Sequence, residues 1–154
     1  ILFEKLITQK ITTYNSKRDR NNILRLEVQR FSDPMNGTLL NYLVSKYGTE
    51  YFEVVDISGN HQLDGYIMAG IERSDKLYIF SIAIEEKYEK QGWGSKLLDR
   101  VISKAKVNGI THFSLHVKIS NYRAQNLYRK FGFVESTLVK DYYGPGKNGF
   151  IMEL

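Results

Sequence analysis

Two glycines separated by a single residue, Gly92 and Gly94, come directly before a strongly helical segment. Glycine at a helix N-terminus lets the backbone approach a ligand closely, and the first N–H groups of a helix have no partner within it. Because the helix dipole also favours negative charge there, the pattern predicts an anion site that suits a pyrophosphate. It is neither a Walker loop nor a dinucleotide-binding fingerprint, and a tight turn between strand and helix is the alternative interpretation.

A second group of polar residues surrounds the next apolar strand of the chain. Asn121 follows that strand and can cap a helix or hydrogen-bond a ligand amide, and Tyr128 lies two turns further along the same helix. His116 lies within the strand between two apolar residues, whose side chains point to the opposite face. An imidazole with a pKa near 6.5 can exchange a proton near neutral pH. The alternative interpretation is structural: a capping Asn, a core Tyr and a hydrogen-bonded strand His.

The composition argues against several other chemistries. The 154-residue chain has no cysteine, which excludes disulfides, thiolate metal sites and a cysteine nucleophile. The histidines and carboxylates show no metal-ligand spacing, so we expect no metal. A net charge of +5 favours anionic partners, but the basic residues are scattered, which leaves nucleic-acid binding as a distant alternative. No apolar run approaches about 18 residues, and the first residues lack the apolar core of a signal peptide, so we expect a cytoplasmic protein without membrane contact.

The elements that must position these residues follow from hydrophobic periodicity, which predicts the order β-α-α-β-β-β-α-β-α-β-β. The predicted strands are Ile7–Ile11, Tyr51–Ile57, Tyr66–Ile71, Leu77–Ile84, Phe113–Val117, Phe133–Lys140 and Phe150–Leu154. The predicted helices carry apolar faces at Leu24, Val28 and Phe31, at Leu39, Leu40, Leu43, Val44 and Tyr47, at Leu97, Leu98, Val101, Ile102 and Ala105, and at Ala124, Leu127, Tyr128 and Phe131. We therefore expect a single α+β domain over residues 1–154, with one crossover between the Leu77 and Phe113 strands.

This succession of strand, glycine loop, helix, strand, Asn, helix and Tyr resembles the GNAT superfamily of acetyl-CoA-dependent N-acetyltransferases. Within it, the chain is most similar to N-terminal (Nα) acetyltransferases of the RimI type, the archaeal Ard type and the catalytic subunit of eukaryotic NatE. The closer likeness rests on the segments LYIFSIAI, LHVKISN, LYRKFGF and DYYGPGKNGFIMEL. It is strong from residue 77 to residue 154 and covers the first half in element order only. The resemblance implies the GNAT fold, a mixed central sheet of about seven strands flanked by about four helices.

The resemblance implies acetyl-CoA as cosubstrate and assigns its contacts position by position. A strand segment would pair with the pantetheine arm, the glycine loop would bind the pyrophosphate, and an Asn and a Tyr would also contact the cofactor. The implied cofactor-binding residues are Ile82, Ala83, Ile84, Lys90, Gln91, Gly92, Trp93, Gly94, Ser95, Asn121 and Tyr128. One position departs from the family pattern, because Glu89 stands where Gln or Arg is usual. A carboxylate near a pyrophosphate is unfavourable unless it points to solvent, so we expect weaker cofactor binding.

The resemblance also implies catalytic and peptide-binding residues. Tyr128 occupies the position of the general acid that protonates the leaving thiolate, and His116 that of the general base. Tyr78 matches a Tyr that helps to deprotonate the incoming amine through water. The residues implied for the peptide groove are Phe31, Pro34, Met35, Tyr78, Tyr142 and Tyr143. Because the chain has no cysteine to carry the acetyl group, we expect direct transfer in a ternary complex.

We therefore expect an N-alpha-acetyltransferase that acts on the free N-termini of proteins or peptides. The pKa of an α-amine lies about 2.5 pH units below that of a Lys side chain, which makes its neutral form easier to reach. An enzyme for a protein lysine or a small-molecule amine is the first alternative. The Tyr142–Tyr143 hairpin argues against it, because it can roof only a groove wide enough for an extended N-terminus. A non-catalytic acyl-CoA-binding module is a further alternative, and a ribosome or an auxiliary subunit is an additional partner that the resemblance allows.

Overall fold

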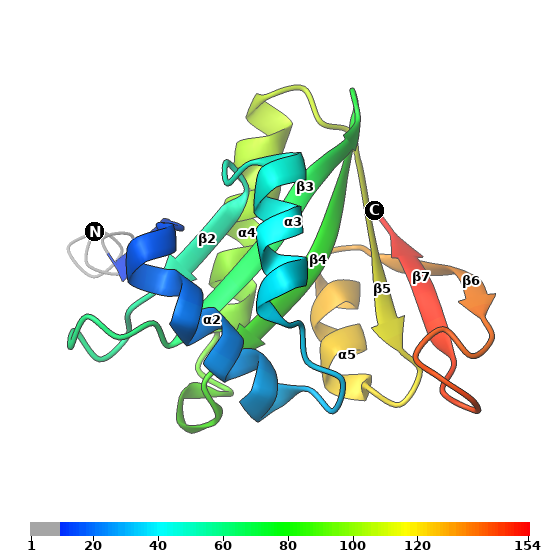
Figure 1. The fold of residues 1–154 in the computed structure, drawn as a ribbon. Coiled ribbons are helices and arrows are strands. Elements are labelled where there is room, and N and C mark those ends of the chain that lie inside the picture. Colours follow the sequence, from blue (N-terminus) through cyan, green and yellow to red (C-terminus); the bar gives the residue numbers. More distant parts are fainter. Residues whose placement is uncertain (1–9) are drawn as a thin grey trace.

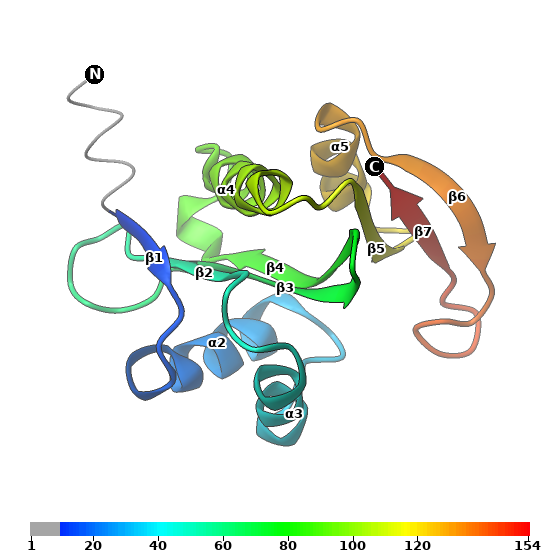
Figure 2. The ribbon, with the colours of Figure 1, turned by 90° about the horizontal axis from the view of Figure 1, so that it is seen from above.

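A computed structural model describes residues 10–154 as a seven-stranded sheet with helices on both faces (Figure 1). The strand order is β1-β2-β3-β4-β5-β7-β6, and the view from above shows α2 and α3 on one face and α4 and α5 on the other (Figure 2). The strands are β1 (Ile11–Thr13), β2 (Phe52–Val55), β3 (Gly65–Arg73), β4 (Lys76–Ile84), β5 (His112–Lys118), β6 (Val134–Val139) and β7 (Gly149–Glu153). The helices are α2 (Ser16–Arg30), α3 (Gly37–Tyr47), α4 (Trp93–Val107), α5 (Tyr122–Lys130) and the short 3-10 helix η1 (Glu86–Tyr88).

The predicted element order is confirmed, and so is the mixed sheet. Strands β4 and β5 are parallel and are connected by a crossover through α4, whereas the other neighbouring strands are antiparallel. The strand predicted at Ile7–Ile11 lies for the most part outside the described residues, and the structure places β1 at Ile11–Thr13. The α+β class follows from a sheet that combines hairpins with one parallel crossover.

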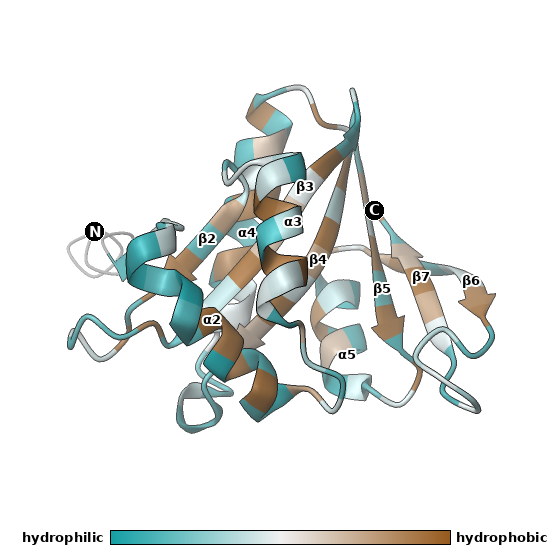
Figure 3. Ribbon diagram, viewed as in Figure 1, coloured by the Kyte–Doolittle hydropathy of each residue, from teal (hydrophilic) through white to brown (hydrophobic). Residues whose placement is uncertain are grey.

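The buried face of α2 differs from the prediction. Val28, which the hydrophobic pattern places on the apolar face, is 69% exposed, whereas Ile23 and Leu26 are fully buried. The helix also buries two carboxylates, Asp19 and Glu27, which accept hydrogen bonds inside the protein. Figure 3 shows α2 as hydrophilic at its N-terminal end, with hydrophobic bands toward its C-terminal end. The other two residues of the predicted face, Leu24 and Phe31, do pack against the core, so the apolar pattern is wrong only at Val28 and misses the buried carboxylates.

The face of α3 is also partly different, whereas that of α4 is as predicted. In α3, Leu40 and Leu43 are buried, but Leu39 is 44% exposed. In α4, Leu97, Leu98, Val101, Ile102 and Ala105 all pack into the core. The core therefore has two layers, one on each side of the sheet, and they hold the four helices against it.

Strands β4 and β5 pair along only part of their length, and this creates the opening in which the site lies. Their pairing runs from Lys76–His112 to Ile79–Leu115 and stops there. The register between β3 and β4 shifts opposite Met68 and Ala69, as expected for a β-bulge, and β4 then stays paired with β3 through Ile84. Beyond Ile79, the edge of β4 that faces β5 has no strand partner among the described residues. Figure 1 shows the two strands diverging below their paired ends.

Candidate active site

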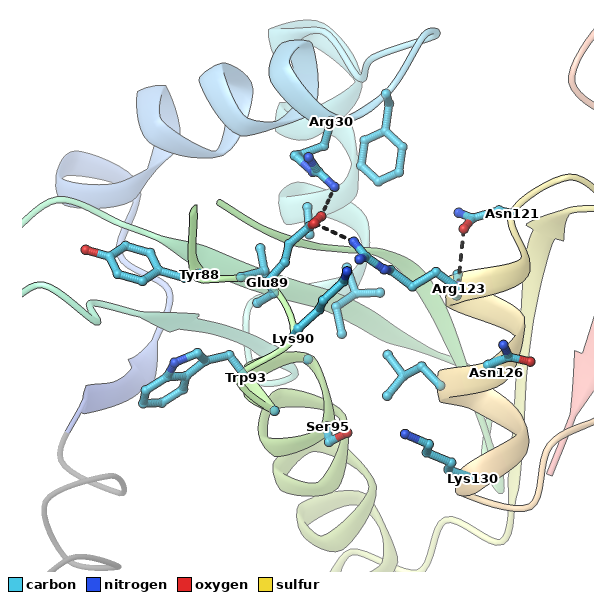
Figure 4. A pocket seen from close by; sticks show the side chains of 18 residues that line it. Arg30, Tyr88, Glu89, Lys90, Trp93, Ser95, Asn121, Arg123, Asn126 and Lys130 are labelled. Carbon is cyan, nitrogen blue, oxygen red and sulfur yellow. Dashed lines mark hydrogen bonds and ion pairs between the residues drawn. The ribbon is translucent and has the colours of Figure 1, made fainter. Parts of the chain in front are cut away.

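A cleft of about 760 Å³ is lined by the part of β4 that has separated from β5. Its other walls are the loop after η1, the first turn of α4, one face of α5 and the end of α2 (Figure 4). The predicted cofactor contacts that line this cleft are Ile82, Ala83, Ile84, Lys90, Gly92, Trp93, Gly94, Ser95 and Asn121. Two further predicted contacts, Gln91 and Tyr128, are not among the lining residues. The glycine loop, the strand segment and Asn121 therefore surround one cavity, although they are far apart in the chain.

The N-terminus of α4 has the backbone shape that the glycine pattern predicts. Gly92 is the N-cap residue and adopts a left-handed conformation with φ of 85°, which residues other than glycine rarely adopt. Gly94 lies against α5, since a Cβ atom there would be 3.4 Å from Leu127 Cδ2. Within the described residues, no side chain caps α4, so its first N–H groups remain available to an anion in the cleft.

Asn121 has the structural role that the sequence allowed, and it also faces the cleft. Its Oδ1 atom accepts a hydrogen bond from the N–H of Ala124 at 3.2 Å and so caps α5. An amide side chain has two donor hydrogens besides its acceptor oxygen, and those of Asn121 can still bind a ligand. The capping interpretation and the ligand interpretation are therefore compatible.

The charged residues of the cleft include three that sequence reasoning missed, namely Arg30, Arg123 and Lys130. Arg30 at the end of α2 and Arg123 in the first turn of α5 both form ion pairs with Glu89. The Glu89 side chain is only 20% exposed and points into the cleft rather than to solvent. Lys90 and Lys130 add two more cations to the lining. No local motif marks the two arginines, because they lie 93 positions apart in the chain and meet only through the fold.

An aromatic cluster lies on β4 and β5 at the point where their pairing ends. The Tyr78 hydroxyl and His116 Nδ1 are 2.5 Å apart, which joins the two strands through a hydrogen bond. The Tyr142 ring stacks on the His116 imidazole with centroids 4.1 Å apart and planes 6° apart, and Tyr143 packs edge-on against Tyr142. Two of the predicted aromatics, Tyr78 and Tyr142, therefore contact the His116 imidazole, and Tyr143 joins the cluster through Tyr142.

Burial changes the acid–base properties of this cluster. Burial raises the pKa of Tyr78, and the neighbouring Tyr142 adds to the effect, so this hydroxyl stays protonated. Burial lowers the pKa of His116, although the more distant Glu72 carboxylate opposes this change. Burial also raises the pKa of Tyr143 to about 12. The imidazole is therefore neutral at physiological pH and has a free lone pair to accept a proton.

Tyr128 belongs to the core beneath the site. It is 6% exposed and packs against Phe133, with ring centroids 5.8 Å apart. Burial raises its pKa, and Tyr143 adds to this effect, so the hydroxyl remains a proton donor well above neutral pH. The core-aromatic interpretation from the sequence is thus confirmed for its ring, and the acid role of its hydroxyl stays a prediction.

The segment between α2 and α3 forms the opposite side of the opening. Phe31 lines the cleft, Met35 is partly buried and Pro34 is exposed. Lys118 Nζ, on β5, is 3.3 Å from Ser32 Oγ and lies 5.9 Å from the centre of the Tyr143 ring. This lysine therefore links the segment to the hairpin that carries Tyr142 and Tyr143.

Sequence reasoning also missed the buried carboxylate that holds this segment in place. Glu27 Oε2 accepts the N–H of Met35 at 3.1 Å, and Oε1 accepts the Ser81 hydroxyl at 2.8 Å. The Tyr66 hydroxyl donates to the same Oε1 atom. Glu27 thus connects α2, β3, β4 and the segment before α3 from a position that is 3% exposed. A glutamate in a helix gives no sequence signal of such a network.

The described residues hold neither a group of metal ligands nor a membrane-spanning helix. No three His, Cys, Asp or Glu side chains within residues 10–154 are grouped as metal ligands would be. No helix in that part of the chain is long and apolar enough to span a membrane.

The fold and the cleft agree with a known class of enzyme. The sequence pattern of the acetyltransferase (GNAT) family matches residues 21–133. The chain belongs to this family of acetyltransferases. The fold and the family that the residues predicted are therefore confirmed.

Individual relatives extend the likeness to nearly the whole chain. The ribosomal protein bS18-alanine N-acetyltransferase of Haemophilus ducreyi is 31% identical over 145 residues, which are 90% of this chain and 94% of the relative. Ard1 from Thermoplasma volcanium has the same fold, with a TM-score of 0.86 at 24% identity over 94% of this chain and 95% of that chain. Arabidopsis thaliana Naa50, solved with the bisubstrate analogue CoA-Ac-MVNAL, has a TM-score of 0.81 at 20% identity over 94% of this chain and 96% of that chain.

Proposed function

We propose that the protein transfers an acetyl group from acetyl-CoA directly to the free N-terminal amine of a protein or peptide in a ternary complex. The observation that carries the proposal is the position of the Tyr78–His116–Tyr142 cluster, which lies where the pairing of β4 and β5 ends. Its residues do not line the cleft itself, which extends along the unpaired edge of β4 at Ile82–Ile84. The relative from Haemophilus is named as a ribosomal protein bS18-alanine N-acetyltransferase. An alanine has no amine other than its α-amine, so this name supports an N-terminal amine as the acceptor.

The cleft has features that fit acetyl-CoA. The open edge of β4 at Ile82–Ile84 offers backbone groups to the two amides of a pantetheine arm. The uncapped N-terminus of α4 and the nearby Lys90 suit a pyrophosphate, and Asn121 can hydrogen-bond the arm between them. When bound, acetyl-CoA supplies the acetyl group as an activated thioester, and the residues described here hold and orient it.

On the acceptor side, His116 acts as the general base. The amine must lose a proton as it attacks the thioester carbonyl, and Nε2 of His116 can take that proton directly or through one water. For this, Nδ1 must carry the other imidazole hydrogen and donate it to the Tyr78 oxygen, and the 2.5 Å separation fits such a bond. Tyr78, which stays protonated, then donates its own hydrogen to the water between the amine and Nε2 and so orients that water, while the amine lone pair stays free to attack.

The second proton transfer is assigned to Tyr128. As the bond between the acetyl carbon and sulfur breaks, the sulfur gains negative charge and needs a proton. The Tyr128 hydroxyl, kept neutral by burial, can supply it. Because the chain contains no cysteine, no thiol of the protein can carry the acetyl group in between.

The acceptor is proposed to be an extended N-terminus rather than a lysine side chain. The Tyr142–Tyr143 hairpin faces the segment from Phe31 to Met35, and Lys118 contacts both sides. This arrangement favours a narrow groove, with partly buried Met35 beside the first side chain. Protein N-termini are therefore the proposed partners, on a ribosome or through an auxiliary subunit.

A panel of short peptides tests the proposal. Acetyl-CoA is offered with peptides that differ in their first residue, and a further peptide has a blocked N-terminus and a free lysine. We expect acetylation of some free N-termini and none of the blocked peptide, measured by mass spectrometry of the products. Acetylation of the blocked peptide at its lysine, at a similar kcat/KM, would contradict the proposal and favour a lysine acetyltransferase.

A further inference from the structure

The cleft carries its own anion, the carboxylate of Glu89. This carboxylate forms ion pairs with Arg30 from α2 and with Arg123 from α5, so the three side chains span the cleft (Figure 4). The side chains of Glu89 and Arg30 are 20% and 24% exposed, whereas that of Arg123 is 54% exposed. The network therefore links α2 to α5 through side chains.

The charge balance of the lining points to a phosphate ligand for the two arginines. Arg30, Lys90, Arg123 and Lys130 line the cleft, and Glu89 is the one acidic residue among the lining residues of the described chain. The planar guanidinium fork of arginine binds both carboxylates and phosphates through paired hydrogen bonds, so one anion can take the place of the other. A cofactor pyrophosphate beside the N-terminus of α4 would repel the Glu89 carboxylate and attract both guanidinium groups.

We propose that Arg30 and Arg123 are a phosphate-binding pair for acetyl-CoA, and that Glu89 holds this pair while the cleft is empty. The proposal rests on the function proposed above. Glu89 competes with the cofactor phosphates for the same donors and therefore lowers the affinity for acetyl-CoA and for the CoA product. Glu89, which stands where the family usually has Gln or Arg, then eases the release of CoA but does not abolish the cofactor site.

The same segment of the chain offers a matched control. Glu85, four positions earlier, forms an ion pair with Arg25 at 3.0 Å and accepts a hydrogen bond from Gln29 at 2.8 Å. It too connects the start of this segment to α2, but it does not line the cleft. A Glu85→Gln variant therefore removes a comparable carboxylate without changing the charge inside the cofactor site.

The test is a binding titration of the purified full chain with CoA, with pantetheine as a ligand that lacks all phosphates. Trp93 is the sole tryptophan and lines the cleft, so its fluorescence reports binding without any turnover. We expect Glu89→Gln to lower the Kd for CoA by about threefold or more, an effect that shrinks as salt is added. Its Kd for pantetheine stays unchanged, and Glu85→Gln leaves both values at those of the wild type.

A second variant keeps the proposal testable if Glu89→Gln folds poorly. The double substitution of Arg30→Gln with Arg123→Gln should raise the Kd for CoA by about tenfold and leave pantetheine binding unchanged. An unchanged or higher Kd for CoA in Glu89→Gln would overturn the competition, and equal effects on CoA and pantetheine would show that the arginines only support the structure. Failure of the wild type to bind CoA would instead overturn the proposed cofactor itself, so the two failures are distinct.

Discussion

The proposed cofactor cleft and the aromatic cluster both lie along the part of the sheet where β4 and β5 separate, yet they are built differently. The cleft is open, lined by charged side chains and by the backbone of a helix N-terminus and a strand edge. The cluster is partly buried and consists of stacked rings joined by one short hydrogen bond. One region has charges and N–H groups that match phosphates, and the other has neutral groups whose pKa values are shifted by burial.

Different interactions therefore dominate on the two sides of the reaction. Binding of a highly charged cofactor is governed by ion pairs and helix N–H groups, which depend on salt and respond to charge changes. Proton transfer is governed by desolvation, which responds to pH and to the removal of single hydroxyl or imidazole groups. Variants in the cleft should therefore change affinity, and variants in and beneath the cluster should change kcat and its pH dependence.

The largest effect is expected for Tyr128→Phe, which removes the proposed acid and keeps the ring. General acid–base catalysis contributes about 10²–10⁴-fold, so kcat should fall about a thousandfold while the Kd for CoA changes little. Steady-state kinetics and the Trp93 titration measure the two quantities separately. Tyr51→Phe removes another buried hydroxyl, one that accepts a hydrogen bond from Asn108 far from the cleft, and should leave kcat unchanged. Full activity of Tyr128→Phe would mean that this residue only packs.

The next effect concerns the base. His116→Ala should lower kcat/KM by about a hundredfold at neutral pH and abolish its acid limb. In the wild type, kcat/KM falls as His116 becomes protonated at low pH. Because burial lowers the pKa of His116, that fall should lie below the usual value near 6.5, and activity persists to lower pH. Exposed His112, on the same strand, serves as the control, since His112→Ala should keep the profile. An unchanged acid limb in His116→Ala would assign the base elsewhere.

A smaller effect is expected in the cleft for Gly92→Ala. A left-handed conformation costs about 1–2 kcal/mol for a residue with a Cβ atom, and relaxation of the loop would displace the N–H groups that face the anion. The Kd for CoA should rise about tenfold, with kcat little changed at saturating cofactor. Gly109→Ala is the matched control, because Gly109 has φ of 86° at the other end of α4 and no atom within 4 Å of its added Cβ. If the two variants lose the same stability but only Gly92→Ala loses affinity for CoA, the loss of affinity belongs to the N-terminal end of α4.

The residues of the cleft were unequally predictable from the sequence. The Gly92–Gly94 pair and Asn121 are local patterns next to helix starts, and they lie where the pattern placed them. The pairing of Arg30 with Glu89 depends instead on how α2 lies across the sheet, which no local pattern encodes. The face of α2 was predicted wrongly at Val28 because hydrogen bonds allow this helix to bury carboxylates in place of apolar residues. Element order follows from periodicity, whereas polar contacts between distant elements follow only from the fold.

The smallest predicted effect tests whether the peptide side depends on such a contact. Glu27→Gln replaces one acceptor oxygen by an NH2 group that would face the donors from Tyr66, Ser81 and Met35. A mismatched buried hydrogen bond costs about 1–3 kcal/mol, most of it in stability. The rest of the cost should appear as a displacement of the segment before α3. This displacement should raise the KM for the peptide about threefold and leave the KM for acetyl-CoA unchanged.

A second buried glutamate distinguishes this positioning from general destabilisation. Glu53 on β2 is fully buried and faces Arg100 and Lys104 of α4, at 3.3 Å and 3.6 Å, away from the groove. Glu53→Gln should lower the melting temperature by a similar amount and change neither KM, because none of its partners touches the segment from Phe31 to Met35. If Glu27→Gln raised both KM values in parallel, or if Glu53→Gln raised the peptide KM equally, Glu27 would support the fold alone. A rise in the peptide KM of Glu27→Gln alone would instead show that Glu27 positions the peptide-binding segment, although its carboxylate does not contact the peptide.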